Sequence, residues 1–423
     1  MRPTLRGAAV ASVHTMSERG AQRTVDVAVI GGGIIGLGIA WTLAHSGRSV
    51  VVIDPDPAGG ATFAAAGMLA AVSELHYREE ALLDLMLASS TLYPDFIDSL
   101  GTDSDATGYQ RTTTLNVGAD AADRQALADL RAVQVANGLG VEPLTVREAR
   151  VLEPVLSPQV SGAFLVEQDH QVDPRRLTER IQFALAALAP NGQDAVIRVR
   201  ARGLLHADAT DTSSRVTGVA LADGSSIQAD EVVVANGLWA GELDGLPEHL
   251  RLPLRPVYGD VLRLRVPEHL RPLLTCTVRG LVHGVPVYLV PRTDGTLVIG
   301  ATQREDGSGV VSAGGVYQLL RDAQALVPAV SELELIETTA RARPGTPDNA
   351  PFLGRVGCSN GDIAGLISAT GFFRHGVLLT PVAAQYGLQL IDGIADDRWR
   401  NFRPDRFSAS REPASASLKG GLS

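Results

Sequence analysis

The chain has 423 residues, of which 45% are hydrophobic and 20% are charged. This composition is that of a globular protein long enough for two or three domains, and it excludes disordered, collagenous and disulfide-framework chains. The formal net charge is -10, from 37 Lys and Arg against 47 Asp and Glu. Because no basic run could neutralise a row of phosphates, we do not expect nucleic acid as a partner.

The ends of the chain and its two cysteines bear on where the protein resides. The first residues carry no apolar run long enough for a signal peptide, and no stretch of about 20 apolar residues follows. We expect disordered tails at residues 1–24 and 404–423, with Met16 as an alternative start. Cys276 and Cys358 form no close pair, and the nine His residues show no ligand spacing. The sequence therefore predicts a cytoplasmic protein without a membrane span or a metal centre.

The first predicted element is a buried strand that leads into a glycine-rich turn. Residues 25–30, VDVAVI, are followed directly by GGGIIG, as expected for a parallel strand buried on both faces. Gly31, Gly33 and Gly36 fit the pattern G-x-G-x-x-G. Such glycines let the backbone approach a pyrophosphate, whose charge is stabilised by the free N–H groups of a helix N-terminus.

The residues after this turn make the pattern specific. Residues 37–46 have apolar side chains at helical spacing, and residues 49–53 predict a second strand that ends on Asp54. Taken alone, the glycines would also fit a merely structural turn. The order strand, turn, helix, strand and acid favours a dinucleotide site, in which Asp54 accepts a hydrogen bond from a ribose hydroxyl.

The rest of the chain alternates between helical and strand patterns. Residues 80–150 look mainly helical, whereas 196–235 contains short strand-like runs at 196–200, 216–221 and 231–235. Residues 252–302 look like strands again and predict an antiparallel sheet in a second domain.

A last strand and glycine turn occurs at residues 366–371, followed by a helix that we expect to begin near Gly376. This unit lies far along the chain from the first one. It would complete the nucleotide-binding sheet and direct a second helix N-terminus at the same ligand.

Four separated segments resemble the FAD-dependent amino-acid oxidase family, also called the D-amino-acid oxidase family, and most closely its glycine oxidase branch of bacterial thiamine biosynthesis. They are the turn at 31–36, AAAGML at 64–69, VVVANGLW at 232–239 and RPGTPD at 343–348. The resemblance extends over residues 25–403. The second and fourth segments, in this order and separation, are the most specific.

The resemblance implies a fold of α/β and α+β parts, in which a Rossmann-like FAD-binding domain is interrupted by a substrate domain with a mixed or antiparallel sheet. The expected FAD-binding domain comprises residues 25–88, 151–245 and 336–403. The expected substrate domain comprises residues 89–150 and 246–335.

The resemblance also implies a set of contacts to non-covalently bound FAD. The expected cofactor-binding residues are Gly31, Gly33, Ile34, Ile35, Gly36, Asp54, Pro55, Ala61, Thr62, Ala66, Gly67, Met68, Gly203, Phe372, Phe373, Arg374, His375, Gly376, Val377 and Leu378. For residues 372–378 there is also a physical reason, because a helix N-terminus there would stabilise the negative charge of a reduced flavin. The alternative for residues 64–69 is a buried helical turn of small side chains.

Three further residues match positions that contact the substrate in this family. Arg343 matches the arginine that binds the substrate carboxylate, a task for which a bidentate guanidinium is well shaped. Strand alternation places Arg341 on the same face, so the choice of Arg343 rests on family position. Tyr288 matches a tyrosine that closes over the substrate, and Arg374 a residue near the substrate amine. A surface ion pair for Arg343 and a core aromatic for Tyr288 are the alternatives.

The implied activity is oxidative deamination of glycine or another small amino acid. The family transfers a hydride from Cα to flavin N5, and dioxygen reoxidises the flavin, which yields an imino acid and hydrogen peroxide. No general base is required, because the substrate binds with its amine neutral. We expect a homo-oligomer and a hand-off of product to thiazole synthase.

Two departures from the family and two alternative functions stay open. Pro286 stands where some glycine oxidases have His, and Gln303 where Met occurs, so the preferred amino acid is less certain than the reaction class. A D-amino-acid dehydrogenase, which passes electrons to an acceptor other than oxygen, shares the RPGTPD-like segment. A non-catalytic FAD-binding subunit is the alternative from another class.

Overall fold

The computed structural model describes residues 23–77, 79–101, 104–190, 193–359, 361–394 and 396–408. Most of the two expected tails, with Met16, therefore lies outside the described residues. The inner ends of both tails are ordered. Residues 23–24 begin the first strand, and residues 404–408 include the 3-10 helix η5 (Pro404–Phe407), where Arg406 pairs with Asp348 at 2.9 Å.

The first sheet is built mainly from parallel strands. Its members are β1 (Arg23–Ile30), β2 (Val50–Ile53), β8 (Val196–Ile197), β9 (Ala201–His206), β10 (Val216–Leu221), β11 (Ser226–Val234), β17 (Phe352–Cys358) and β18 (Gly361–Thr370). The order is β17-β18-β11-β1-β2-β8, with β10 and β9 extending from β11. The central pairs β8–β2, β2–β1, β1–β11 and β11–β18 are parallel. The predicted nucleotide-binding sheet is confirmed.

Four helices cover one face of this sheet. They are α1 (Ile34–His45), α3 (Glu80–Ser99), α7 (Pro174–Leu188) and α9 (Thr380–Ile391). The sequence of α1, IIGLGIAWTLAH, is apolar on all sides, and the helix is buried because α7 and α9 pack on it and α3 packs on α9. The helix expected near Gly376 begins at Thr380, because residues 372–379 form an irregular turn first.

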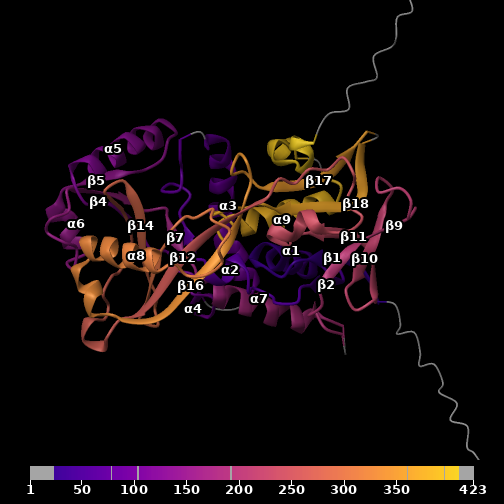
Figure 1. Ribbon diagram of the computed structural model, residues 1–423, viewed down its shortest axis with the longest axis horizontal. Coiled ribbons are helices and arrows are strands. Elements are labelled where there is room, and N and C mark those ends of the chain that lie inside the picture. The colour runs from indigo at the N-terminus through magenta and orange to yellow at the C-terminus, as the bar shows by residue number, and fades with distance from the viewer. Residues whose placement is uncertain are drawn as a thin grey trace, which may run out of the picture.

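The second sheet is mixed, with one parallel pair among antiparallel ones. Its strands are β4 (Thr114–Gly118), β5 (Glu142–Leu144), β6 (Gly162–Val166), β12 (Arg255–Arg265), β13 (Thr277–Val282), β14 (Val285–Pro291), β15 (Thr296–Gly300) and β16 (Glu334–Gly345). Their order is β16-β12-β15-β14-β13-β4-β6-β5, and the parallel pair is β13–β4. Figure 1 shows this sheet on the left and the first sheet on the right.

Alternation along its strands gives the second sheet two different faces. Leu262, Leu289 and Ile299 point toward α8 (Ala313–Leu326), with which they form a buried core. Their neighbours Val261 and Tyr288 lie on the opposite face, which is turned toward residues 66–68. Three short elements lie on the side of that face: α2 (Ala61–Ala64), β3 (Met68–Leu69) and β7 (His170–Gln171).

Sheet membership divides the chain differently from the expected domain boundaries at three elements. Helix α3 packs on α9 beside the first sheet, although most of it falls in the expected substrate segment 89–150. Strands β6 and β16 belong to the second sheet, although 151–245 and most of β16 were assigned to the FAD-binding domain. An amphipathic pattern shows that a segment packs against a sheet, but not which sheet it packs against.

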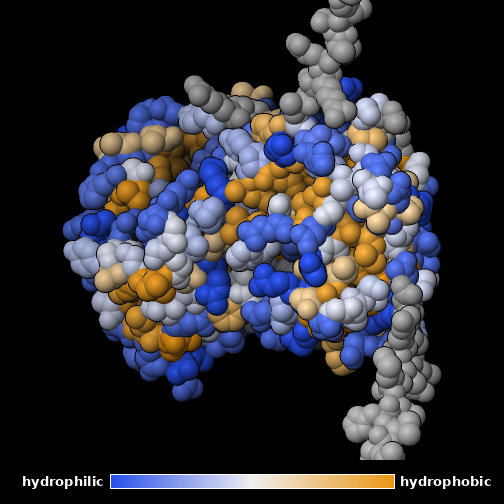
Figure 2. All heavy atoms as spheres, turned by 45° about the vertical axis from the view of Figure 1, so that its right-hand side comes forward, coloured by the Kyte–Doolittle hydropathy of each residue, from blue (hydrophilic) through white to orange (hydrophobic). Residues whose placement is uncertain are grey.

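The remaining described elements are short or peripheral. They are α4 (Ser104–Thr107), α5 (Ala121–Ala136), α6 (Val146–Leu152), η1 (Gly237–Glu242), η2 (Glu268–Leu270), η3 (Pro328–Glu332) and η4 (Asp397–Phe402). The surface carries both polar and apolar side chains. In Figure 2, apolar residues gather near the centre of the face, and a band of polar residues lies across this apolar area.

The packing of Gly36 generates a stability prediction. A Cβ at Gly36 would lie 2.0 Å from the carbonyl oxygen of Gly31, so backbone would have to move to admit it. We expect Gly36→Ala to lower the free energy of unfolding by about 1–3 kcal/mol or more, as overpacking does. Urea denaturation measures it. Gly241→Ala is the control, because its nearest neighbour would lie at 3.7 Å; equal effects in both variants would contradict the prediction.

Candidate active site

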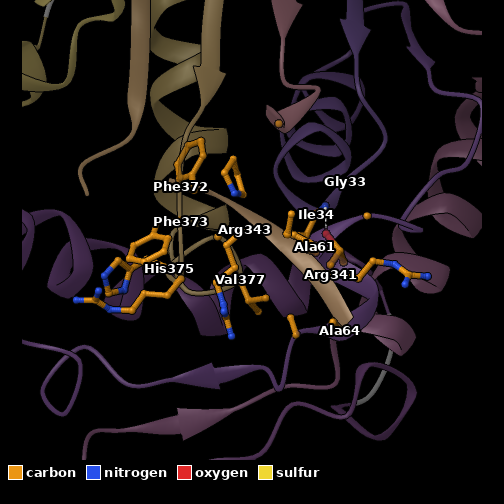
Figure 3. Close-up of a pocket in the computed structure, with 18 of the residues that line it drawn as sticks. Gly33, Ile34, Ala61, Ala64, Arg341, Arg343, Phe372, Phe373, His375 and Val377 are labelled. Atoms are coloured by element: carbon orange, nitrogen blue, oxygen red, sulfur yellow. Dashed lines mark hydrogen bonds between the residues drawn. The ribbon is translucent and has the colours of Figure 1, made fainter. Parts of the chain in front are cut away.

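A cavity of about 1120 Å³ lies between the two sheets. Drug-sized ligands typically occupy about 300–1,000 Å³, so this space is large enough for a dinucleotide together with a small substrate. The first sheet contributes the carboxyl ends of β1 and β2, and the second sheet contributes residues of β12, β14 and β16. Figure 3 shows residues 372–377 on one side and Gly33, Ile34 and Ala61 on the other, with Arg343 between them.

The glycine turn after β1 brings bare backbone to the cavity wall. Gly31 has a φ of +107°, and a Cβ there would lie 2.5 Å from the carbonyl oxygen of Ala235. Gly33 is the N-cap of α1 and offers no side chain to the helix, whose first turn has no acidic residue. Among the described residues, the N–H of Ile34 in the first turn of α1 has a side-chain acceptor, the Thr62 hydroxyl at 3.1 Å. The helix terminus is thus shaped for an anionic group.

Asp54 lies at the end of β2 and lines the cavity, as expected. Its carboxylate accepts hydrogen bonds from the backbone N–H of Gly32 (2.6 Å) and of Asp56 (2.8 Å). Each oxygen therefore has one partner and keeps a further lone pair for a ligand. The arrangement fixes the carboxylate beside the glycine turn, where a ribose hydroxyl would follow the pyrophosphate.

Residues 376–378 present unpaired backbone amides to the cavity. Their carbonyl groups accept hydrogen bonds from the side chains of Thr380 (2.9 Å), Tyr93 (3.0 Å) and Ser89 (2.6 Å), which lie behind them. Within the described part of the chain, the three N–H groups have no such partner. Because the carbonyls are held on the protein side, the amides face the cavity and form a site for negative charge.

Arg343 extends into the cavity from β16 with no acidic partner. Its Nη1 makes one long contact, 3.4 Å to the carbonyl oxygen of Thr302, and no carboxylate lies within ion-pair distance among the described residues. A Cβ at Gly259 would lie 2.3 Å from the same nitrogen, so the glycine leaves the room that the guanidinium occupies. A partly buried cation without an acidic partner, at the wall of a cavity, is suited to an anionic ligand.

Arg341 shares the face of β16 with Arg343 but not its environment. The register of β16 with β12 pairs Arg341 with Gly259 and Arg343 with Val257, which confirms that both point the same way. Arg341 reaches the outer rim, where its Nε donates to the carbonyl of Gly59 at 3.0 Å and its guanidinium lies over Phe63. It is exposed and already partnered.

Tyr288 stands on β14 in the wall of the cavity near Arg343. A Cβ at Gly300, its neighbour across β15, would lie 2.3 Å from the phenol oxygen, so the ring lies flat over that glycine. Burial raises the pKa of the Tyr288 phenol, partly offset by the positive charge of Arg343. The hydroxyl therefore stays protonated and can donate a hydrogen bond.

Arg374 lines the cavity as part of an ion-pair network that the sequence did not reveal. Its guanidinium pairs with Glu74 at 3.0 Å and with Glu79. Glu74 also pairs with Arg279 of β13, and the two guanidinium groups keep the pKa of this buried carboxyl well below its usual value, although burial alone would raise it. The positive charge of Arg374 is thus balanced by carboxylates of the protein, whereas that of Arg343 has no such partner among the described residues.

His375 is buried beside this network without a hydrogen bond to either ring nitrogen. Burial, reinforced by the charge of Arg374, lowers the pKa of the imidazole to about 3. The ring is therefore neutral at ordinary pH and acts as a packing group, not as a general acid or base.

Two of the expected cofactor residues do not line the cavity. Gly36 packs on Gly31 inside the turn and supports the helix–strand contact. Gly203 faces Asp244, where a Cβ would lie 2.6 Å from the Asp244 Cβ, and its neighbours at 200–202 line the cavity instead. All other expected cofactor and substrate residues line the cavity. Lining residues that the sequence did not indicate include Glu74, Asn116 and Arg279, which are isolated polar or charged residues without a local pattern.

No helix of the described ranges has the length and apolarity needed to cross a membrane. The described residues also contain no cluster of three or more His, Cys, Asp or Glu placed to hold a metal ion.

The neutral burial of His375 generates a pH prediction. Its folded-state pKa lies below the unfolded value of 6.5, so the unfolded chain binds more protons and stability falls as the pH drops through this window. The loss from this group is about 2 kcal/mol between pH 6.5 and pH 5. We expect His375→Asn to lose less stability over that interval than the parent protein, as measured by urea unfolding at both pH values. An unchanged pH dependence, equal to that of the exposed control His269→Asn, would contradict this.

The chain is similar to several characterised proteins over most of its length. A family model described as FAD dependent oxidoreductase matches residues 26–390. The bifunctional protein ThiO/ThiG of Synechocystis sp. is 34% identical over 93% of this chain, which spans only 55% of that relative. Glycine oxidase of Geobacillus kaustophilus is 32% identical over 87% of this chain and 93% of its own.

The solved structures agree with this match. The crystal structure of glycine oxidase from Geobacillus kaustophilus superposes with a TM-score of 0.80 and 28% identity, and covers 92% of this chain and 100% of its own. The match confirms the expected fold class. Together with the glycine turn, the amide-lined segment and the dinucleotide-sized cavity, it establishes that this chain is a member of the family of FAD-dependent oxidoreductases.

Proposed function

We propose that the protein catalyses the FAD-dependent oxidative deamination of glycine or another small amino acid. The observation that carries this proposal is Arg343, a guanidinium that reaches the cavity without a carboxylate partner in the described chain. It is surrounded by a cavity wall that is otherwise mainly apolar. A ligand that supplies a carboxylate would complete it.

The protein fits FAD in several independent ways. The open terminus of α1 suits the pyrophosphate, Asp54 suits the ribose, and the amides of residues 376–378 suit the pyrimidine edge of the flavin. Neither cysteine lines the cavity, which supports non-covalent binding. When bound, FAD accepts a hydride from the substrate, and this is the demanding part of the chemistry.

The side chains orient the substrate and neutralise its charge. Arg343 binds the carboxylate in a bidentate manner, and the protonated Tyr288 hydroxyl donates a second contact from the opposite strand. Arg374 is held by Glu74 and Glu79, so its guanidinium does not compete for the carboxylate. Its backbone carbonyl remains free to accept a hydrogen bond from the substrate amine.

Three titratable side chains around the proposed substrate position are poorly suited to act as a general base, in agreement with a hydride mechanism. Tyr288 is held protonated, the His375 imidazole is a weak base because burial lowers its pKa to about 3, and the Glu74 carboxylate is held by two guanidinium groups. Pro286 and Gln303 both line the cavity, where they differ from some glycine oxidases. They are the positions at which we expect the choice between glycine and its analogues to be made.

The proposal extends to where the protein acts and what it acts with. The Synechocystis relative is named as a bifunctional ThiO/ThiG protein, and this chain aligns with about half of it. This supports a hand-off of product to a thiazole synthase partner. Both cysteines are free thiols, as expected in a cytoplasm. Assembly into a homo-oligomer remains a prediction.

Anaerobic mixing tests the reaction directly. Purified protein with its flavin is combined with glycine, sarcosine or D-alanine, and the flavin absorbance near 450 nm is followed. We expect glycine to bleach it and peroxide to appear when air is admitted. Bleaching without peroxide would identify a dehydrogenase, and flavin that none of the three amino acids bleaches would refute the proposal.

Substitution of Arg343 tests the carboxylate site. We expect Arg343→Lys to retain FAD but to raise KM for glycine by about 10- to 100-fold, because an ammonium group cannot form the bidentate contact. Arg341→Lys, on the same strand and face, is the matched control and should leave KM nearly unchanged. A rise in KM for the control and none for Arg343→Lys would move the carboxylate site to Arg341.

A further inference from the structure

Five charged side chains, of which three are buried and two half-buried, form a group behind residues 66–68, outside the cavity. We call them the rear cluster; its members are Asp173, Arg175, Arg263, Arg292 and Glu337. They come from the start of α7, from β12, from the end of β14 and from β16. None of them lines the cavity, and none has a role in the proposed reaction.

The ion pairs within the rear cluster are unequal. Arg175 and Glu337 form a bidentate pair, with contacts of 2.5 and 2.9 Å. Arg263 is 3.7 Å from the same carboxylate, and Arg292 is 3.8 Å from Asp173, both too long for a hydrogen bond. Asp173 is further occupied as the N-cap of α7, where it accepts from the N–H of Arg175 at 2.9 Å.

The cluster therefore holds more positive than negative charge. Three guanidinium groups face two carboxylates, and the Arg263 and Arg292 side chains are only 7% and 5% exposed. Arg263 Nη2 and Arg292 Nε are buried without a hydrogen-bond partner. Burial lowers the pKa of Arg292 to about 10, which still leaves it charged at neutral pH. The neighbouring Asp294 is exposed and screened by water.

The surplus charge lies directly behind the cavity wall. Arg292 Nη2 donates to the carbonyl of Ala66, and Arg292 Nη1 donates to the carbonyl of Val172 at 3.0 Å. Arg263 lies on the same face of the second sheet as Tyr288. Tyr288 is aligned with Gly300 of β15, and Arg263 is aligned with Val298, two residues earlier on that strand. Val261, Val290 and Val298 pack with Ala66 between these strands and residues 66–68, next to Met68 and Tyr288. A charge acts more strongly across a mainly apolar layer than across water.

We propose that the rear cluster is a fixed positive charge that raises the reduction potential of the bound flavin. Transfer of a hydride brings two electrons and one proton to the flavin, so its charge becomes more negative by one. The neutral amine that loses the hydride becomes an iminium ion, which carries the balancing positive charge away. A cation held behind Ala66 stabilises that added charge without touching the substrate. This inference rests on the proposed placement of the flavin along residues 66–68.

Substitution of Arg263 tests the inference, because this side chain makes no short hydrogen bond whose loss would disturb the fold. In the flavin-loaded protein, Arg263→Met should lower the midpoint potential so that the ratio of reduced to oxidised flavin at a fixed potential falls about tenfold, or about 30 mV for a two-electron couple. Arg263→Lys keeps the charge and should restore most of the potential. Glu337→Gln removes a negative charge and should shift the potential upward.

The measurement uses a chemical reductant and a reference dye, so that it does not depend on amino-acid turnover. Arg265→Met is the matched control, since Arg265 lies on the same face of β12 but is 56% exposed and paired with Glu334. Flavin content and melting temperature are recorded for every variant. The inference would be overturned if Arg263→Met folded and bound flavin but kept the parent's midpoint potential. It would also be overturned if the midpoint potential of Arg263→Lys were as low as that of Arg263→Met. Failure of glycine to reduce the parent flavin would instead refute the proposed function.

Discussion

The parallel pairing of β1 with β11 and β2 is the constraint on which the rest of the site depends. Ile30 is aligned with Val234 on one side and with Ile53 on the other. Because parallel strands end at the same edge, this register brings the glycine turn, Asp54 and Ala235 together although they lie far apart in the sequence. Gly31 has to be a glycine since the backbone after β11 passes directly over it.

The second sheet places polar side chains in the wall of the cavity, and the first sheet places the glycine turn and Asp54 there. Its outer face packs on α8, so that only the inner face is available, and alternation then decides which side chains enter the cavity. Tyr288 and Arg343 lie on that inner face. Two arginines that line the cavity differ in their partners: among the described residues, Arg374 is paired with two carboxylates and Arg343 with none.

Much of this arrangement could be predicted from the sequence, because the decisive signals are local. The glycine turn, the strand that ends on Asp54 and the final strand–glycine unit each occupy a few consecutive residues whose spacing reflects their geometry. The positions of Arg343 and Tyr288 came from family resemblance, and strand alternation alone left Arg341 and Arg343 equivalent. The structure separates them, because Arg341 finds Gly59 and Phe63 at the rim.

What the sequence could not predict depends on contacts between distant segments. Glu74, Arg279 and Arg374 are single charges in unrelated stretches, and only the fold shows that they form one network. The rear cluster is of the same kind. Gly203 does not line the cavity whereas residues 200–202 do, since a strand pattern indicates which residues alternate but not which end of the strand faces a cavity.

The hydrogen bonds that hold the carbonyl groups of residues 376–378 link this segment to α3, which lies far from it in the sequence. Two of the three side chains that hold these carbonyls, Ser89 and Tyr93, belong to α3, a helix that does not itself line the cavity at those positions. The Tyr93 hydroxyl thus fixes the peptide plane between Val377 and Leu378 from the side opposite the cavity. The geometry of this part of the cavity wall therefore depends on a helix none of whose described residues lines the cavity.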